Sequence, residues 1–251
     1  MVKKKQLKTK KNSNKSKVTV SNRIPTYISG LDPLMEGGFK RNSINLVVGG
    51  AGSGKTIFAL QFLINNIIKN KETVIYITFE EKKRELYDNM QAFGWDMEKF
   101  EKEGKLIFLE YSPEQVKKML LEGGGLIENI LTKSKVRLIV IDSITSFTLL
   151  YQNELARKEA ALSLFGLIRS WNCTALLTEE IVDFEKSEKG GLQFEVDSIV
   201  LLYHGKEEGI RKRAIEILKM RGTTHAGKTL QLNITRKGLE VNPTKIVTFD
   251  H

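Results

Sequence analysis

Residues 49–56, with the sequence GGAGSGKT, are the part of the chain whose composition and spacing most clearly predict chemistry. They match the phosphate-binding pattern G-x-x-x-x-G-K-[ST] in full. Glycine lets the backbone pass close to an anion, so that successive N–H groups can point into one concavity. Lys55 can then contact the β- and γ-phosphates of a nucleotide, and the Thr56 hydroxyl can ligate Mg²⁺. We therefore expect a bound nucleotide to contact Gly49, Gly50, Ala51, Gly52, Ser53, Gly54, Lys55, Thr56 and Ile57.

The segments on either side of this phosphate loop have the order that the pattern requires. Residues 44–48 form an apolar, β-branched run that predicts a strand, and residues 57–68 have apolar side chains at helical spacing. The loop would end at a helix N-terminus, whose free N–H groups and dipole favour negative charge. A glycine-rich turn without a ligand is the alternative, and the flanking strand and helix favour nucleotide binding over it.

Acidic side chains follow two further apolar runs that predict strands. Glu80 and Glu81 come after the first run, and Asp142 ends the second. In open parallel sheets, ligands bind beyond the carboxyl ends of the strands, so these carboxylates should share an edge with the phosphate loop. Asp142 could hold Mg²⁺ together with Thr56, and Glu80 or Glu81 could orient the attacking water or accept its proton. The alternative for Glu80 and Glu81 is a solvated pair at the start of a charged helix.

Strand and helix patterns alternate along the chain, which predicts an α/β fold with a parallel sheet. Strands are expected at residues 44–48, 73–79, 106–109, 138–142 and 174–178, and helices at 57–68, 82–93, 113–121, 126–132 and 154–171. Two hairpins are expected within residues 196–220 and 229–241, with His204 in the first turn, and residues 181–194 should form a mobile loop. Thr178, at a strand end, could sense the γ-phosphate or be a satisfied hydroxyl.

Composition indicates a globular domain preceded by a basic tail. The chain has 251 residues, 41% of them hydrophobic, and a net charge of +10. Residues 1–20 hold eight lysines and no acid, so the rest of the chain sums to only +2. We expect the tail to be disordered. It could bind nucleic acid or an acidic membrane face, or simply keep the protein soluble.

Cysteine usage and hydrophobic patterning exclude several classes of protein. Cys173 is the single cysteine, which excludes an internal disulfide and a cysteine-based metal site, and we expect a buried thiol. The three histidines form no metal-binding cluster in the sequence. No run approaches the roughly 18 apolar residues of a membrane span, and the N-terminus lacks the apolar core of a signal peptide. We therefore expect a soluble, cytoplasmic protein.

Five spaced motifs resemble the KaiC-like branch of the RecA/RadA ATPase superfamily, over about residues 23 to 242. They are SGLD at 29–32, TFEE at 78–81, FGW at 93–95, IDSITS at 141–146 and KMRGTTH at 219–225. The resemblance implies a RecA-type P-loop NTPase fold, a twisted and mostly parallel sheet flanked by helices, with C-terminal β-hairpins. It also implies rings, commonly hexamers, with ATP bound between neighbours. The domain would span residues 23–251, and residues 1–22 would be the tail.

The last of these motifs, at residues 219–225, implies contacts with a neighbouring subunit. By the resemblance, Lys219 and Arg221 match residues that reach across to the neighbour's γ-phosphate. Thr223 and His225 match residues of the same strand that border the neighbour's nucleotide. Alternation along the predicted strand independently places Lys219 and Arg221 on one face, where they could instead be solvated edge charges.

The resemblance supports one assignment and leaves others open. Glu80 matches the water-activating glutamate of the family, and Glu81 matches the residue that supports it. Arg236 and Ala92 depart from the family pattern near the nucleotide base or ribose, so base selectivity is open. KaiC proteins carry two tandem copies of the domain and this chain carries one, so clock behaviour is not implied. The autophosphorylation pair of the second copy is not recognisable in residues 181–194.

We predict an ATP-hydrolysing ring whose nucleotide cycle regulates or remodels a protein partner. A RadA-like recombination or repair ATPase is the alternative. Its two DNA-gripping loops would lie near residues 149–157 and 182–195, and the second carries a net charge of −2 where DNA needs positive charge. A nucleotide sensor in a larger machine, such as an archaeal motility motor, is a third reading, which Glu80 and Glu81 oppose by offering a base. For a phosphoryl-transferring kinase, the sequence shows no acceptor pocket.

Overall fold

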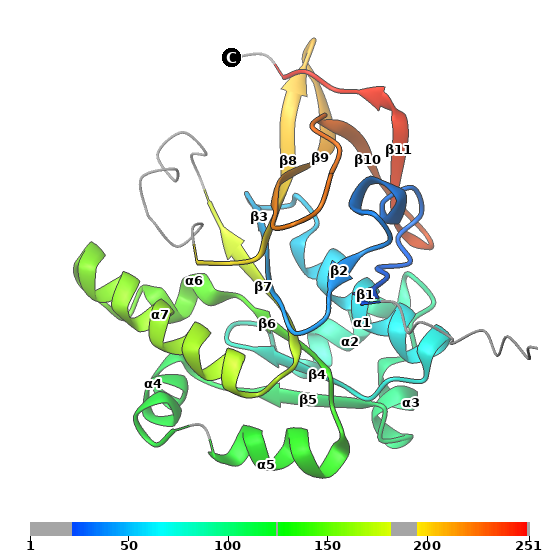
Figure 1. Ribbon diagram of the computed structural model, residues 1–251. Helices are drawn as coiled ribbons and strands as arrows, with labels where there is room; N and C mark the ends of the chain where they lie inside the picture. The colour runs from blue at the N-terminus through cyan, green and yellow to red at the C-terminus, as the bar shows by residue number, and fades with distance from the viewer. Residues whose placement is uncertain (1–21, 124, 182–194, 250–251) are drawn as a thin grey trace, which may run out of the picture.

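The computed structural model describes residues 22–123, 125–181 and 195–249 (Figure 1). The lysine-rich tail and nearly all of the loop predicted at 181–194 lie outside these residues. The disorder of the tail, the domain boundary at residue 22 and the mobility of that loop therefore stay predictions.

A nine-stranded sheet runs through the described part of the chain, in the order β11-β10-β9-β8-β3-β7-β6-β4-β5. Its parallel strands are β3 (Ile44–Gly49), β4 (Val74–Thr78), β5 (Leu106–Glu110), β6 (Leu138–Asp142), β7 (Thr174–Glu180) and β8 (Ser198–Glu207). The antiparallel strands β9 (Ile210–Met220), β10 (Leu230–Thr235) and β11 (Gly238–Ile246) extend the β8 side. A separate ribbon pairs β1 (Arg23–Ile24) with β2 (Phe39–Lys40). The predicted α/β fold, mostly parallel with two C-terminal hairpins, is confirmed.

Helices cover both faces of the parallel part of the sheet (Figure 1). The helices are α1 (Lys55–Asn70), α2 (Lys83–Gln91), α3 (Met97–Lys102), α4 (Pro113–Leu121), α5 (Gly125–Ser134), α6 (Ile144–Thr148) and α7 (Glu154–Ser170), and a short 3₁₀ helix, η1, spans Asp32–Met35. Side chains of α1 join one apolar cluster, and side chains of α6 and α7 join a second cluster on the opposite face. The sequence patterns did not predict α3 and α6, because one or two turns are too short to show a helical period.

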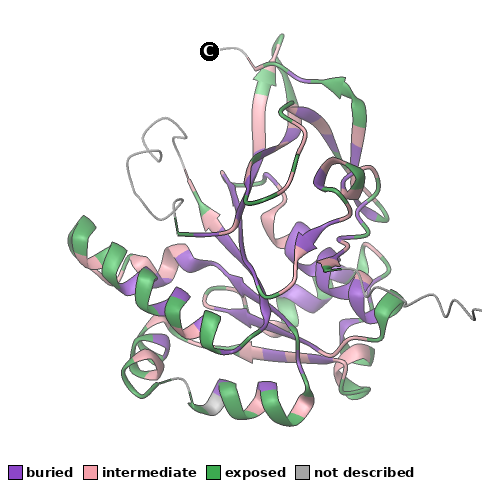
Figure 2. Ribbon diagram, viewed as in Figure 1, coloured by how far each residue is buried: buried purple, intermediate pink, exposed green. Residues whose placement is uncertain are grey.

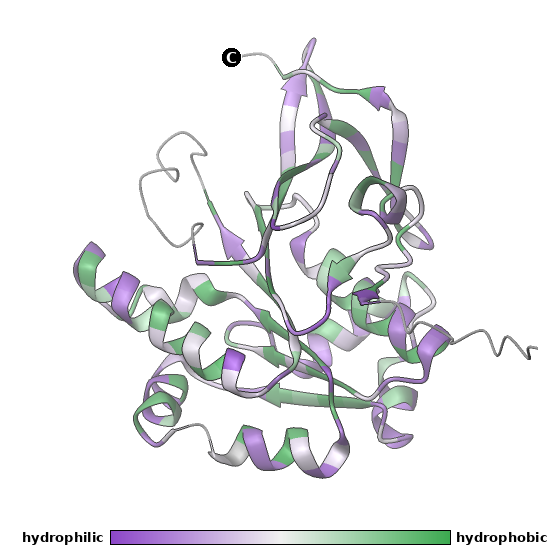
Figure 3. Ribbon diagram, viewed as in Figure 1, coloured by the Kyte–Doolittle hydropathy of each residue, from purple (hydrophilic) through white to green (hydrophobic). Residues whose placement is uncertain are grey.

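The core lies where these layers meet the central strands. β3, β4 and β6 are buried along their whole length, as expected of parallel strands that are covered on both faces. Figure 2 shows this buried centre, and Figure 3 shows that its strands are predominantly hydrophobic. Cys173 is buried as predicted, and burial raises the pKa of its thiol to about 12.

The first C-terminal hairpin is longer than its sequence pattern predicts. Its turn lies at Glu208 and Gly209, both with positive φ, so His204 belongs to β8 and faces Arg213 of β9. The prediction that His204 is a turn residue is wrong. The solvent-exposed ends of β8 and β9 are as polar as the turn between them. Polarity alone therefore ended β8 too early and began β9 too late.

Gln61 of α1 anchors the second hairpin to the core. Its amide Nε2 donates to Leu239 O at 3.2 Å, and its Oε1 accepts from Leu239 N at 2.7 Å. Gln61 is buried, so both backbone groups of Leu239 depend on this one side chain.

Replacing Gln61 with methionine should therefore destabilise the protein at nearly constant volume. Two buried backbone groups would lose their partners, which costs about 1–3 kcal/mol for each group. Urea denaturation should show a lower midpoint, whereas Gln152→Met, at an exposed position, should leave the midpoint unchanged. Equal midpoints for the two variants would contradict this anchoring role.

Glu179, near the carboxyl end of β7, makes the stability of the fold depend on pH. It pairs with Val48 in the sheet and shares a face with Leu177, which belongs to the second apolar cluster. Burial raises the pKa of its carboxyl group to about 7. Folding therefore takes up a proton between pH of about 4.5 and about 7, and stability falls as pH rises through this window.

Replacing Glu179 with glutamine should remove the loss of stability that the buried carboxylate causes at high pH. The variant should be more stable than the wild type at pH 8, by ~1–3 kcal/mol, and the gain should be much smaller at pH 5. Urea midpoints at the two pH values measure the difference. A gain of equal size at both values would show that the carboxyl group does not take up a proton on folding.

Candidate functional site

The phosphate loop connects the carboxyl end of β3 to the first turn of α1. Gly52 has φ 72° and Gly54 has φ 105°, values that favour glycine, and Gly54 caps the helix. Lys55 extends back across the loop, where its Nζ donates to Gly50 O at 3.0 Å. The loop therefore surrounds a small space with backbone groups and one ammonium, next to a helix N-terminus.

Glycine is sterically required at the start of this loop. A Cβ on Gly49 would lie 2.5 Å from both Leu202 O and Ser53 Oγ. Ser53 is fully buried, and among the described residues its hydroxyl has no hydrogen-bond partner. A side chain larger than hydrogen at position 49 would therefore displace Ser53 or the β8 backbone.

The first hairpin supports the loop from the side. Arg213 Nε donates to Gly52 O at 2.8 Å, and His204 Nδ1 lies 3.5 Å from Ala51 O. Because Arg213 and His204 face each other across β8 and β9, they contact the loop as a pair. The sequence patterns missed both contacts, since nothing along the chain relates a hairpin to a loop 150 residues earlier.

Polar side chains lie near the carboxyl ends of β6 and β7, on the same edge as the loop. Asp142 at the end of β6 accepts a hydrogen bond from the Thr178 hydroxyl of β7. Its other oxygen accepts from Tyr76 of β4 at 2.7 Å. Burial, followed by the charge of Asp142, raises the pKa of Tyr76 well above its ordinary value. Thr178, two residues before the end of β7, is thus a satisfied hydroxyl, one of its two predicted roles, and Tyr76 is a positioning residue that the sequence patterns missed.

Tyr76 could have been found from the period of its strand. It stands two residues before Thr78, whose Cα pairs with that of Asp142, and alternate residues of a strand share a face. A tyrosine in a strand buried on both faces needs a partner for its hydroxyl. The carboxylate at the end of the neighbouring strand was the available acceptor.

Glu80 lies beside Asp142 and has its own set of donors. Its Oε1 accepts from the Ser143 hydroxyl at 3.0 Å and from the Ser146 hydroxyl. These serines belong to the start of α6, directly after β6, so the same strand end positions both carboxylates. The N–H groups of Glu80 and Glu81 donate to the Thr78 hydroxyl, which fixes the turn.

Glu81 is the second carboxylate of this turn. Burial raises the pKa of Glu81, and the charges of Asp142 and Glu80 raise it further. The edge therefore carries several negative groups in a confined space, an arrangement that favours a bound cation. A cavity of about 280 Å³ adjoins both glutamates, between the ends of β4 and β5.

The donor set fits Mg²⁺ rather than a protein-bound transition metal. Thr56 and Asp142 offer hard oxygen ligands, and Mg²⁺ in nucleotide sites is held by one or two such groups together with phosphates and water. Within the described ranges, no group of three or more His, Cys, Asp or Glu side chains could hold a metal by itself. Thr56 and Asp142 would therefore hold the ion jointly with the nucleotide.

The segments that carry the two departures from the family pattern meet at Gly238 and Trp95. A Cβ on Gly238, in the turn after Arg236, would lie 2.9 Å from Trp95, three residues after Ala92. The same turn lies near the loop, since a Cβ on Gly54 would meet Leu239 at 3.5 Å. The second hairpin therefore lies near the start of α1, and the effect of Arg236 and Ala92 on base selectivity stays a prediction.

Lys219 and Arg221 lie at the opposite edge of the sheet from the phosphate loop. A bulge in β9 places Ile199 opposite Lys219 and Val200 opposite Ile217, so Ile217 and Met220 both join the core. Lys219 and Arg221 consequently share the face away from the core, as alternation predicts. Burial lowers the pKa of Lys219, and the charge of Arg221 lowers it further.

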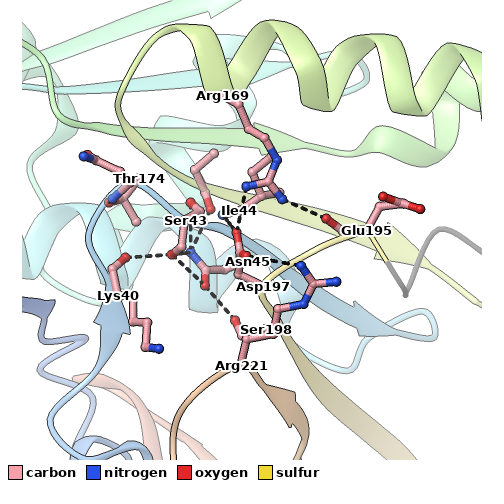
Figure 4. A network of polar contacts seen from close by, with 12 residues as sticks. Lys40, Ser43, Ile44, Asn45, Arg169, Thr174, Glu195, Asp197, Ser198 and Arg221 are labelled. Atoms are coloured by element: carbon pink, nitrogen blue, oxygen red, sulfur yellow. Dashed lines mark hydrogen bonds and ion pairs between the residues drawn. The ribbon is translucent and has the colours of Figure 1, made fainter.

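Asp197 connects Arg221 to the first residue of β3 (Figure 4). Its Oδ2 accepts from Ile44 N at 2.9 Å, and its Oδ1 lies 3.9 Å from the Arg221 guanidinium. Arg169 of α7 pairs with the same carboxylate at 3.4 Å. The six residues of β3 span about 16 Å, so Arg221 cannot reach the phosphate loop of its own chain.

Thr223 and His225 follow β9 in an irregular segment. β9 ends at Met220, so the prediction that both residues continue its strand is wrong. Gly222, with φ 61°, turns the chain there, and the segment is held by other contacts. Arg23 donates to the Thr223 hydroxyl at 2.9 Å, and Ala226 N donates to Leu34 O.

The residues predicted to form the site thus lie in two groups within one chain. The phosphate loop, Asp142 and Glu80 meet at the carboxyl edge, and Lys219, Arg221, Thr223 and His225 gather at the amino edge. In the part of the chain that the structure describes, no helix is both long and apolar enough to cross a bilayer.

Known proteins are similar to this chain in sequence and in fold. Residues 24–246 match a family model described as "ATPase: KaiC". The circadian clock oscillator protein KaiC of Synechococcus elongatus is 33% identical over 243 residues, which cover 94% of this chain and 47% of the relative. The circadian clock protein KaiC3 of Synechocystis is 33% identical over 238 residues, which cover 91% of this chain and 47% of the relative.

A solved structure extends the likeness to the whole fold. The crystal structure of a KaiC-like protein from the hyperthermophilic archaeon Pyrococcus horikoshii matches with a TM-score of 0.79 and 32% identity. The match covers 88% of this chain and 99% of that one, whereas this chain spans about half the length of the curated relatives it matches. With a family model over residues 24–246 and a relative one-third identical along nearly the whole chain, this protein is a member of the KaiC family of ATPases.

Proposed function

We propose that this protein binds Mg²⁺-ATP on the phosphate loop and hydrolyses it at a site completed by a neighbouring copy in a ring. The observation that carries the proposal is the separation of the two halves. Asp142 and Glu80 lie at the edge of the phosphate loop, whereas Lys219 and Arg221 lie at the opposite edge, about 16 Å along β3. Two copies packed edge to edge would bring one copy's cations to the other copy's phosphates.

The phosphate loop and Lys55 bind and orient the triphosphate. Backbone N–H groups of the loop and the first turn of α1 donate to phosphate oxygens, and Lys55 exchanges its contact with Gly50 O for the β- and γ-phosphates. Thr56 and Asp142 would hold Mg²⁺, which when bound would supply positive charge that offsets the charge of the phosphate oxygens. The hydrogen bonds from Tyr76 and Thr178 keep Asp142 in place for this task.

Glu80 activates the water. The hydroxyls of Ser143 and Ser146 hold its carboxylate at the edge. Glu80 accepts the proton of the water as its oxygen bonds to the γ-phosphorus, while the bond from that phosphorus to the β–γ bridging oxygen breaks. ADP and inorganic phosphate are released, and Glu80 returns the proton to solvent. Glu81 supports this turn from the adjacent position.

The cations of the neighbour stabilise the charge that develops on the γ-phosphate. Such a cation is worth about 10³–10⁵ in rate in related phosphoryl-transfer sites. Hydrolysis in one copy would therefore change the contacts between copies, which offers a way to regulate or remodel a protein partner. We propose that the ring is a hexamer and that the partner is a protein.

Glu80→Gln should keep ATP binding and lose hydrolysis. The amide preserves the size and the hydrogen bonds of the side chain but cannot accept a proton, so turnover should fall about 10²–10⁴-fold. Phosphate release measures turnover, and a fluorescent ATP analogue measures binding. Glu103→Gln, at an exposed position on the far side of α3, is the matched control and should behave as wild type. Unchanged hydrolysis in Glu80→Gln would rule out Glu80 as the base.

A further inference from the structure

The β1–β2 ribbon presents two basic side chains to the segment that follows β9. Phe39 is buried in the first apolar cluster, so its neighbour Lys40 points to the opposite face of β2. Arg23 is the cross-strand partner of Lys40, and partners in an antiparallel pair project to the same face. Arg23 contacts Met220 Sδ at 3.8 Å and the Thr223 hydroxyl at 2.9 Å, so this face meets the end of β9.

Arg23 holds this segment together through hydrogen bonds and an ion pair. One guanidinium nitrogen donates to Met35 O and Gly38 O, and the other forms an ion pair with Glu36 at 2.8 Å. Glu36 in turn accepts from Thr224 N at 3.1 Å. The ion pair neutralises Arg23, which acts as a structural clamp.

Lys40 is placed differently, because its ammonium lies against Gly222. A Cβ on Gly222 would be 2.5 Å from Lys40 Nζ, and Gly222 has a φ of 61°. Gly222 stands between Arg221 and Thr223, so the ammonium lies beside the backbone of the residues expected to face a neighbour's nucleotide. Figure 4 shows Lys40 next to the strand end that carries Arg221. Among the described residues, no carboxylate lies within 4.0 Å of Lys40.

The ammonium of Lys40 lies at the bend that follows Arg221. Arg221, the residue before Gly222, shares the carboxylate of Asp197 with Arg169. An ammonium at this bend, with a glycine that leaves room for it, is suited to contact phosphate oxygens.

We propose that Lys40 is a third cation that each copy presents to the triphosphate bound by its neighbour, and that Gly222 keeps the ammonium at this surface. The proposal rests on the proposed function, since it needs the amino edge of one copy to meet the phosphate loop of the next. It adds a residue from the N-terminal ribbon to the two cations that sequence reasoning assigns to this face.

A set of matched substitutions separates the charge of Lys40 from its packing. Lys40→Met keeps the length of the side chain without its charge and should lower kcat/KM for ATP about tenfold. Lys40→Arg should restore most of that loss. Lys102→Met, on the exposed face of α3, is the control and should leave kcat/KM unchanged. The thermal midpoint should be the same in all four proteins, because Lys40 is not part of the core.

Gly222→Ala tests the same idea without changing any charge. The added Cβ would displace the flexible Lys40 ammonium, so kcat/KM should fall, and Gly222→Ala combined with Lys40→Met should lose little more than Lys40→Met alone. Fully additive losses in the double variant would overturn the proposal.

A parallel variant, Lys219→Met, distinguishes failure of this proposal from failure of the proposed function. A large loss in Lys219→Met with none in Lys40→Met would overturn the role of Lys40 and leave the shared site standing. No loss in either variant would overturn both. Equal losses in Lys40→Met and Lys40→Arg would show that shape rather than charge matters there, and would also overturn the proposal.

Discussion

The parallel pairing of β3 with β7 and β8 is the constraint on which the rest of the structure depends. The register places the start of the phosphate loop beside the last residue of β7 and beside Leu202 in the middle of β8, and it places Ile44 beside Asp197 at the other end. One short, fully buried strand therefore sets the positions of both halves of the site. Because β3 is hydrogen-bonded on both sides, neither half can shift along the sheet without breaking the ladder.

The same sheet also positions the buried hydrogen bonds to Asp142. Tyr76, Thr178 and Asp142 come from three adjacent strands, and their side chains meet because the strands end in register. A buried carboxylate is costly unless its oxygens have partners, and here each oxygen has one hydroxyl donor. The same oxygens face the edge where a cation would bind, so the network stabilises the fold and prepares the site at once.

Features that depend on local sequence could be predicted. The phosphate loop, Asp142 at the end of β6 and helix α4, which the pattern placed at its observed bounds of Pro113–Leu121, all follow from short-range spacing and chemistry. The placement of Glu80 beside Asp142 followed from the rule that parallel strands share a carboxyl edge. The family resemblance supplied the assignment of Lys219 and Arg221 to a neighbouring copy, which local patterns could not give.

Features that depend on register could not be predicted. The contacts of Arg213 and His204 with the loop require knowing how far the first hairpin extends, and polarity placed its turn too early. The bulge in β9, which keeps Ile217 and Met220 in the core, has no sequence signal of its own. Lys40 lies against Gly222 only because a two-residue ribbon packs on the end of β9.

The central claim is that each ATP site uses groups from two copies of the chain, and mixing two inactive variants tests it most directly. Lys55→Ala removes the phosphate-binding half of a site, and Arg221→Ala removes the half supplied by the neighbour. In mixed assemblies, the loop of an Arg221→Ala copy can meet the intact Arg221 of a Lys55→Ala copy. The account predicts that mixing the two variants, after dissociation and reassembly, restores a measurable fraction of wild-type turnover. A mixture that stays as inactive as its components, in assemblies shown to contain both variants, would contradict the shared site.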